Sequence, residues 1–299
     1  MASSAASSLA THVTASLILL PLGIRRLLCC TSLYLADPSL YTSKIWYFSQ
    51  PNSKNTDLYT LLIVLPLASF SHIFIFLASL SGSTNPTYTF SFLQHSFVIF
   101  LFWALLLLII LKESFHLYSF PDNFVFIFAA IAFLIEFYMS GRGFVGLGGA
   151  LYGILGGLSI ACAACCIILS VRPSAFFAEF LLSSGLVLKG TWVLQVGLSL
   201  YTDAFGLKGC AKISGLASPK GELDVKCELE DDRSRGVALL NLLFVWHIIV
   251  VFMANFMLFG LSNRNRNKRS GGEASGPLLA QIGGSGDISM HPLTEFELE

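Results

Sequence analysis

The sequence predicts an all-α fold, a polytopic membrane protein built as a bundle of about seven transmembrane helices. Of its 299 residues, 55% are hydrophobic and only 12% are charged, whereas soluble domains carry about 25% charged residues. The apolar residues gather in runs of roughly 20, which is the length of a helix that crosses a bilayer. The 18 basic residues balance the 18 acidic ones, so no extended basic surface indicates a nucleic-acid partner.

The first apolar run, residues 12–33, predicts an uncleaved first span. The Ser- and Ala-rich start before it carries no charge, a composition that also fits a plastid or mitochondrial transit peptide. A secretory signal peptide has its positive charge before the apolar core, whereas Arg25 and Arg26 come after it here. We therefore expect the chain to enter the membrane at this span, with its N-terminus outside.

Six further spans and two polar segments complete the predicted domain organisation. Together with the first span they make residues 1–261 the transmembrane domain, and they cover residues 58–80, 91–111, 121–140, 146–170, 176–201 and 236–261. The connection 202–235 holds nearly all the remaining charge and is predicted to be a lumenal loop. The tail, 262–299, is basic at first and then Gly- and Ser-rich, so we expect it to be disordered and cytosolic.

The sixth span carries a lysine, Lys189, inside an otherwise apolar run. A charge at bilayer depth costs about 2.5–3.5 kcal/mol on insertion scales, so this lysine must face a partner or a cavity. Polar residues gather within an arc of roughly 120° on one side of the helix: Lys189, Trp192, Gln195 and Ser199. The opposite side predicts close helix packing through small residues at seven-residue spacing: Ser183, Gly190 and Gly197. Glu179, in the first turn, complements the helix N-terminus.

The fifth span repeats a small residue every four positions, a spacing that also predicts a close-packed helix face. The repeat runs through Gly149, Gly153, Gly157, Ala161 and Cys165. The same span holds a C-x-x-C pattern at Cys162 and Cys165. Because cysteine in so apolar a run most often packs as a small hydrophobic residue, we expect packing there, with redox or metal chemistry as the alternative.

Eight polar side chains inside the spans are the candidate functional residues: His72, His95, Glu136, Lys189, Gln195, Asn241, His247 and Asn255. One interpretation is hydrogen bonding between helices. A second is a pathway for protons, ions or small solutes, in which Glu136 and His247 titrate and Lys189 is the counter-ion. A third is a metal-dependent membrane hydrolase, which lacks support from spacing because no H-x-x-x-H or H-E-x-x-H motif occurs. We expect no catalytic residue, metal or cofactor.

Charge next to the spans predicts the orientation. Four basic residues directly follow the last span, which places the C-terminus in the cytosol and the N-terminus in the lumen or outside: Arg264, Arg266, Lys268 and Arg269. This orientation places the basic residues of the 202–235 loop outside, which conflicts with the preference of basic residues for the cytosolic side. The same loop carries Cys210 and Cys227, a candidate disulfide on an oxidising side of the membrane.

Three stretches resemble the transmembrane protein 45 family, especially its plant branch of viral-response family proteins. Residues 11–39 resemble the family's Gly-His opening and Asn-Pro-Ser turn, and residues 92–96 its Glu-His-Ser segment. The most specific stretch, Leu188–Gly197, is similar to a Gln-Gly-Thr-Trp-Phe-Gln-Ile-Gly motif, and an aromatic-Trp-His helix follows it at residues 244–247. The resemblance implies a multi-pass membrane protein; plant members have no assigned reaction, and animal relatives are associated with endomembranes. The family's histidines after the fourth span are absent here, and Lys189 replaces an uncharged residue.

The function expected from these features is that of a non-enzymatic endomembrane protein of interaction or adaptor type. Its partners are the lipid bilayer and other membrane proteins or further copies of the chain. The alternative is a membrane protein that conducts protons, ions or small solutes through intramembrane Glu, Lys and His side chains. We expect it in the endomembrane system or the plasma membrane.

Overall fold

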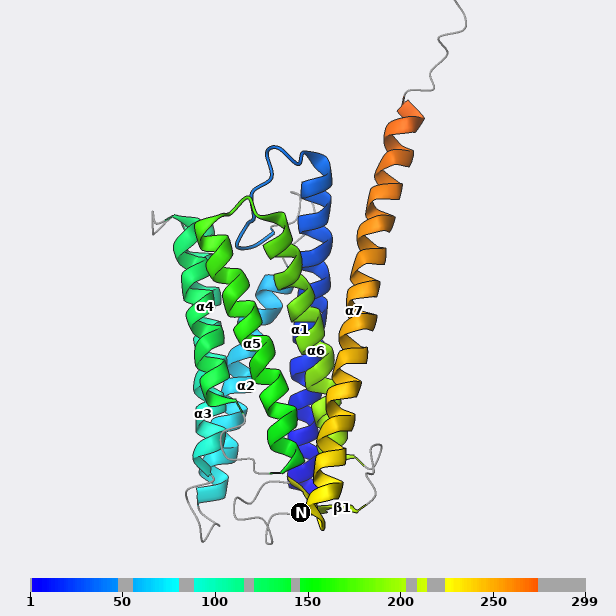
Figure 1. The fold of residues 1–299 in the computed structure, drawn as a ribbon. Helices are drawn as coiled ribbons and strands as arrows, with labels where there is room; N and C mark the ends of the chain where they lie inside the picture. Colours follow the sequence, from blue (N-terminus) through cyan, green and yellow to red (C-terminus); the bar gives the residue numbers. More distant parts are fainter. Residues whose placement is uncertain are drawn as a thin grey trace, which may run out of the picture.

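The computed structural model describes residues 2–47, 56–80, 89–115, 121–140, 146–202, 209–213 and 224–273. These residues form seven helices and one short β-hairpin. The helices are α1 (Ala2–Ala36), α2 (Thr56–Leu80), α3 (Thr89–Phe115), α4 (Asp122–Met139), α5 (Leu147–Val171), α6 (Phe176–Tyr201) and α7 (Glu230–Glu273). Figure 1 shows α1 to α6 running up and down in one bundle, with α7 along one side and extending beyond it.

The helical bundle confirms the predicted all-α polytopic membrane fold. Six of the described helices are long and apolar enough to cross a bilayer: α1, α2, α3, α5, α6 and α7. The exception is α4, whose 18 residues reach only about 27 Å at 1.5 Å per residue. The predicted fourth span, residues 121–140, is therefore apolar but shorter than the roughly 30 Å hydrocarbon core.

Helices α1 and α6 approach each other most closely, and glycine makes this approach sterically feasible. A Cβ atom added at Gly190 would lie 2.8 Å from the backbone nitrogen of Leu20, and one at Gly197 would lie 2.7 Å from Cβ of His12. A Cβ atom added at Gly23 of α1 would likewise lie 2.7 Å from the backbone nitrogen of Val187. Gly190 and Gly197, predicted as a packing seam, thus lie against α1.

Two glycines in the middle of the repeat predicted on α5, Gly153 and Gly157, do not face a neighbouring helix among the described residues. Both are exposed, and apart from the backbone of their own helix no described atom lies within 4 Å of the position where their side chains would begin. Cys165, the last member of the repeat, is buried. Helix α5 instead buries the face of Gly156, whose added Cβ would lie 3.0 Å from Phe137 of α4. A four-residue spacing of small residues identifies one narrow face of a helix, but it does not show that this face is the one that packs. In α5 the packed face is the one that carries the larger apolar residues.

Helices α2 and α3 form a hairpin that joins the rest of the bundle through α4. Ser69 and Ser96 bond each other across the hairpin, with 2.8 Å between their hydroxyl oxygens, and Phe102 of α3 packs edge-on against Phe133 of α4. Trp46, in the α1–α2 connection, packs against Leu58 and its neighbours at the start of α2. Further along, no extensive packing joins α1 to α2 among the described residues.

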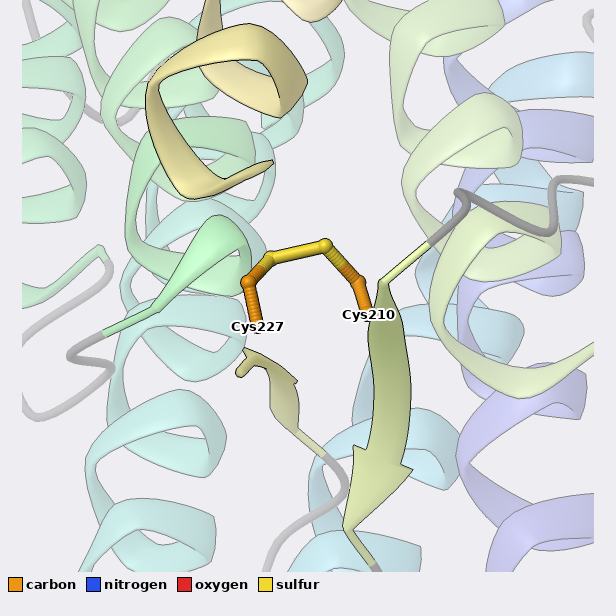
Figure 2. The surroundings of a disulfide bond; sticks show 2 residues. All are labelled: Cys210 and Cys227. Atoms are coloured by element: carbon orange, nitrogen blue, oxygen red, sulfur yellow. A yellow bond between two sulfur atoms is a disulfide. The ribbon is translucent and has the colours of Figure 1, made fainter. Parts of the chain in front are cut away.

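The connection before α7 contains an antiparallel hairpin of β1 (Cys210–Ile213) and β2 (Asp224–Cys227). Cys210 faces Cys227 in register, and the two form a disulfide with an S–S distance of 2.03 Å (Figure 2). The hairpin lies at the end of the bundle that also holds the N-terminus and the start of α7 (Figure 1). The rest of the predicted 202–235 loop lies partly outside the described residues.

Helix α7 extends beyond the predicted span, 236–261, at both ends. It begins at Glu230, and the acids of its first turn complement the helix N-terminus. It continues to Glu273, so the first twelve residues of the predicted disordered tail are helical, whereas residues 274–299 lie outside the described residues. The apolar run identifies only the part of the helix that is suited to the bilayer. The helix itself continues into the polar residues on both sides of that run.

Candidate functional site

Three helices bring an ion pair together at mid-depth in the bundle. Lys189 lies 13 residues from the start of α6 and 12 from its end, about 18–20 Å from either by helix rise. Its ammonium group pairs with the Glu136 carboxylate of α4 and donates a hydrogen bond to Oγ of Ser159 in α5 at 2.9 Å. The Ser159 hydroxyl in turn donates to Oε2 of Glu136 at 3.3 Å. The charged partner that the sequence requires for Lys189 is therefore Glu136.

The two members of this pair differ in exposure. The side chain of Lys189 is 2% exposed, and its Nζ lies 5.0 Å from the centre of the Phe133 ring, which adds a cation–π contact. The Glu136 side chain is 20% exposed. Lys189 is thus sealed inside the bundle as a counter-ion, while part of the Glu136 side chain faces open space.

That open space is a cavity of about 640 Å³ lined by residues of α1 to α6. Its wall is mostly aliphatic, and its ionisable and phenolic groups are His12, His72, His95, Glu136, Tyr152 and Tyr201. Tyr201 ends α6 and Met139 ends α4, so the cavity lies in the half of the bundle that holds the N-terminus and β1 (Figure 1). The cavity therefore reaches from this end to the mid-depth ion pair.

The short α4 helps to explain why the cavity exists. The last residues of α4 lie beside Gly156, since an added Cβ there would be 3.8 Å from Cβ of Ser140. Gly156 is nine residues into α5, about 13 Å from its start. Helix α4 therefore stops about 13 Å short of the end at which α5 begins. On the other side, α1 and α2 share no extensive packing among the described residues. Met139 and Ser140 line the cavity where the helix ends.

Three histidines from three helices face the cavity. The rings of His72 in α2 and His95 in α3 lie 6.3 Å apart between centroids. His12 of α1 shares a hydrogen bond with the Tyr152 hydroxyl, 3.0 Å from Nε2, and its ring lies 5.5 Å from that of Tyr201. The spacing of residues in the sequence does not single out His12, because its partner Tyr152 is 140 residues away. Only the stretch that resembles the known family includes this position.

The remaining predicted residues lie elsewhere. Nε2 of His247 is 2.8 Å from the Thr191 hydroxyl, and its ring packs edge-on against Trp192, so it does not line the cavity with Glu136. Gln195 donates to Ser199 of its own helix at 3.3 Å. Asn255 is buried in α7, whereas Asn241 is exposed. The structure thus unites Glu136 with Lys189 and separates both from His247.

A second ion pair lies at the opposite end of the bundle. Nη2 of Arg26 in α1 is 2.7 Å from Oε1 of Glu179 in α6, and the Tyr47 hydroxyl donates to the same oxygen at 3.3 Å. Arg26 also donates from Nη1 to the carbonyl of Ile45 at 2.8 Å. Burial and the nearby Glu179 raise the pKa of Tyr47, so its hydroxyl stays protonated and donates. Glu179 is fully buried, so it does more than complement the helix N-terminus.

The described part of the chain contains no cluster of side chains suited to binding a metal ion. There, no three His, Cys, Asp or Glu side chains lie close enough together to hold one metal ion. Cys162, Cys165 and Cys166 are buried in the hydrophobic core between α4, α5 and α6. The cavity and its ion pair are therefore the candidate site.

The comparison with known proteins gives a match to a family model. No curated protein matches the chain. The finer resemblance to the plant branch of the transmembrane protein 45 family stays a prediction. Residues 122–260, just under half of the chain and including both Glu136 and Lys189, match the model of a family of unknown function, DUF716.

Proposed function

We propose that this multi-pass membrane protein binds a small solute in its intramembrane cavity, with Glu136 and the cavity histidines as the polar contacts. One observation carries the proposal: Glu136 is ion-paired at mid-depth, yet keeps 20% of its side chain exposed at the cavity wall. The cavity volume of about 640 Å³ falls within the range of roughly 300–1,000 Å³ typical of ligand sites. An aliphatic wall with a few convergent polar groups is also typical of such sites.

The ion pair supports binding because its two members have different roles. Lys189 is too deeply buried to meet a solute, but it offsets the charge of a carboxylate that would otherwise be costly in lipid. Lys189 and Ser159 both contact Oε2 of Glu136. A solute at the exposed side of Glu136 meets a hydrogen-bond acceptor whose position is fixed by two other helices.

This proposal favours the small-solute alternative over an interaction role. A bundle that acts only by helix packing needs no internal space, and among the described residues the end around Arg26 and Glu179 has only a small hollow of about 20 Å³ beside Arg26. The half around Glu136 holds the cavity of about 640 Å³. The adaptor role, the endomembrane location and the absence of catalysis stay predictions. The disulfide and the basic tail support an N-terminus and cavity on the lumenal or outer side.

Native mass spectrometry of the full chain, released from nanodiscs, tests the proposal because it detects a bound solute by mass alone. The wild-type protein is expected to carry a discrete adduct. Ala68→Phe places a ring in the cavity from α2 and is expected to remove the adduct. Ala164→Phe is the matched control, because Ala164 is exposed on α5 and does not line the cavity.

Thermal unfolding of each variant accompanies the mass measurement, so that a loss of adduct is read only from folded protein. An adduct that persists in Ala68→Phe, or a wild-type protein that carries none from any expression host, overturns the proposal.

A further inference from the structure

We propose that the solute is an uncharged amphiphile with a hydroxyl head group, which reaches the cavity from the bilayer between α1 and α2. This inference rests on the proposed function and assigns its ligand class. It follows from three features of the cavity: its net charge, the hydrogen-bonding character of its polar groups, and the helices that form its wall.

The net formal charge of the site is zero. Among the described residues that line the cavity, Glu136 is the only one with a charged side chain at about pH 8, where histidine, with an ordinary pKa of about 6.5, is neutral. Lys189 offsets that charge. A cationic or anionic head group would bring an unpaired charge into this mostly aliphatic space, and the resulting loss of hydration would oppose its binding. An uncharged head group avoids this penalty.

The polar groups of the wall both donate and accept hydrogen bonds. Glu136 accepts, as do the hydroxyls of Thr14 and Ser71, which donate their own protons to backbone carbonyls. The imidazoles and the tyrosine hydroxyls have both capacities. An ammonium group only donates, and a sulfate only accepts. A hydroxyl does both, so it can bond to Glu136 and to a neighbouring imidazole or phenol at once. The wall therefore matches an alcohol better than either ion.

The rest of the wall suits an apolar body. Its aliphatic side chains come from opposite sides of the cavity, among them Ile18, Val64, Leu65, Ile99, Leu155 and Val193. Burying apolar surface against them contributes about 25 cal/mol per Å² relative to water. Relative to lipid the gain is smaller, so the hydroxyl contacts decide which amphiphile stays. This places the head group near Glu136 and the body along the aliphatic wall.

The packing of α1 and α2 provides a route from the bilayer. Both helices line the cavity, α1 with Ala15 and Ile18 and α2 with Val64 and Ala68. Yet α1 packs mainly against α6, and α2 against α3, where Trp103 donates from its indole nitrogen to the carbonyl of Leu62 at 3.1 Å. The α2–α3 hairpin can therefore separate from α1 without breaking its own contacts.

Photo-crosslinking with three matched probes tests the ligand class. Hexadecanol, hexadecyl sulfate and hexadecylamine, each with the same diazirine on the alkyl chain, are added to the full chain in nanodiscs at about pH 8. The alcohol is expected to label peptides of α1 and α2 at least about tenfold more than either charged probe, because an unpaired charge is strongly disfavoured at the site. Ala68→Phe is expected to abolish this labelling, and Ala164→Phe to leave it unchanged.

The outcomes separate this inference from the proposed function. Equal or stronger labelling by the amine or the sulfate overturns the ligand class, as does alcohol labelling that survives Ala68→Phe. If the native adduct is present while no probe labels α1 or α2 preferentially, the ligand class is wrong and the proposed function stands. If neither adduct nor labelling is found, both are wrong.

Discussion

The Arg26–Glu179 pair and the Lys189–Glu136 pair each join a basic and an acidic side chain from different helices, yet their surroundings differ. At the first pair the acid is fully buried, Tyr47 donates to it, and Arg26 also donates to a backbone carbonyl. Among the described residues, Nε of Arg26 and Oε2 of Glu179 make no hydrogen bond. At the second the base is buried and the acid faces a cavity. The comparison shows that a buried ion pair in this bundle closes one end and forms part of a candidate binding site at the other.

The difference arises from the segments that flank each pair. At the Arg26 end, the α1–α2 connection folds over the bundle, and the backbone nitrogen of Ser43 donates to the carbonyl of Pro173 at 2.7 Å. Trp46 then fills the space beside α2. At the Glu136 end, α4 stops short and α1 lacks extensive packing with α2 among the described residues. Covering segments seal the first pair, whereas the short α4 leaves the second open.

The largest effect is expected for Glu179→Ala. It leaves the Arg26 guanidinium, whose side chain is 12% exposed, without its counter-ion, and such a loss costs about 3–5 kcal/mol. The yield of folded protein by fluorescence-detected size exclusion and its Tm should fall sharply. Glu230→Ala is the control, because its pair with Arg233 is exposed and is worth only about 0.5 kcal/mol. Similar losses in both variants would show that the sealed pair is not special.

A smaller loss of stability is expected for Lys189→Met. It leaves Glu136 unpaired, but the carboxylate can take up a proton or water from the cavity, so we expect about 1–3 kcal/mol. The double variant Lys189→Met with Glu136→Gln should recover most of that loss, since no charge remains. Unchanged expression and Tm in Lys189→Met would contradict the pairing, and failure of the double variant would contradict the role of the exposed carboxylate.

The smallest effect is a pH dependence confined to the sealed end. Because the pKa of Tyr47 is raised by burial and by Glu179, the folded state holds this proton more tightly than the unfolded state. Its contribution is fully present below the ordinary tyrosine pKa of about 10 and is lost as the pH rises above that value. A plot of Tm against pH should therefore fall more steeply above about pH 10 in the wild type than in Tyr47→Phe. Parallel curves would remove Tyr47 from the account of this end.

The bundle itself could be predicted from the sequence because hydrophobic runs of bilayer length are a direct signal. The need of Lys189 for a partner could also be predicted, since lipid leaves a lone charge unsatisfied. The identity of that partner could not, because Glu136 is 53 residues away and a helical wheel says nothing about which helices are neighbours. For the same reason the sequence groups His247 with Glu136, whereas His247 bonds Thr191 on another side of α6.

The packed face of α5 and the role of His12 could not be predicted from the sequence, for related reasons. The glycine spacing of α5 describes a narrow helix face, but Gly153 and Gly157 stay exposed because larger residues on the opposite face make the contacts. A lone histidine near the start of the chain, as His12 is, carries no signal of its own. Its role depends on Tyr152 and Tyr201, which only the folded bundle brings to it.

The most direct measurement compares Glu136→Gln with Glu179→Gln by native mass spectrometry and thermal unfolding of the same preparations. We predict that Glu136→Gln carries much less adduct than the wild type on the molecules that fold, and that it also lowers Tm because it leaves the buried Lys189 without its counter-ion. Glu179→Gln likewise leaves Arg26 without its counter-ion and is expected to lower Tm, but with unchanged adduct on the molecules that remain folded. A Glu136→Gln protein with the full wild-type adduct would contradict the claim that the open ion pair belongs to a binding site.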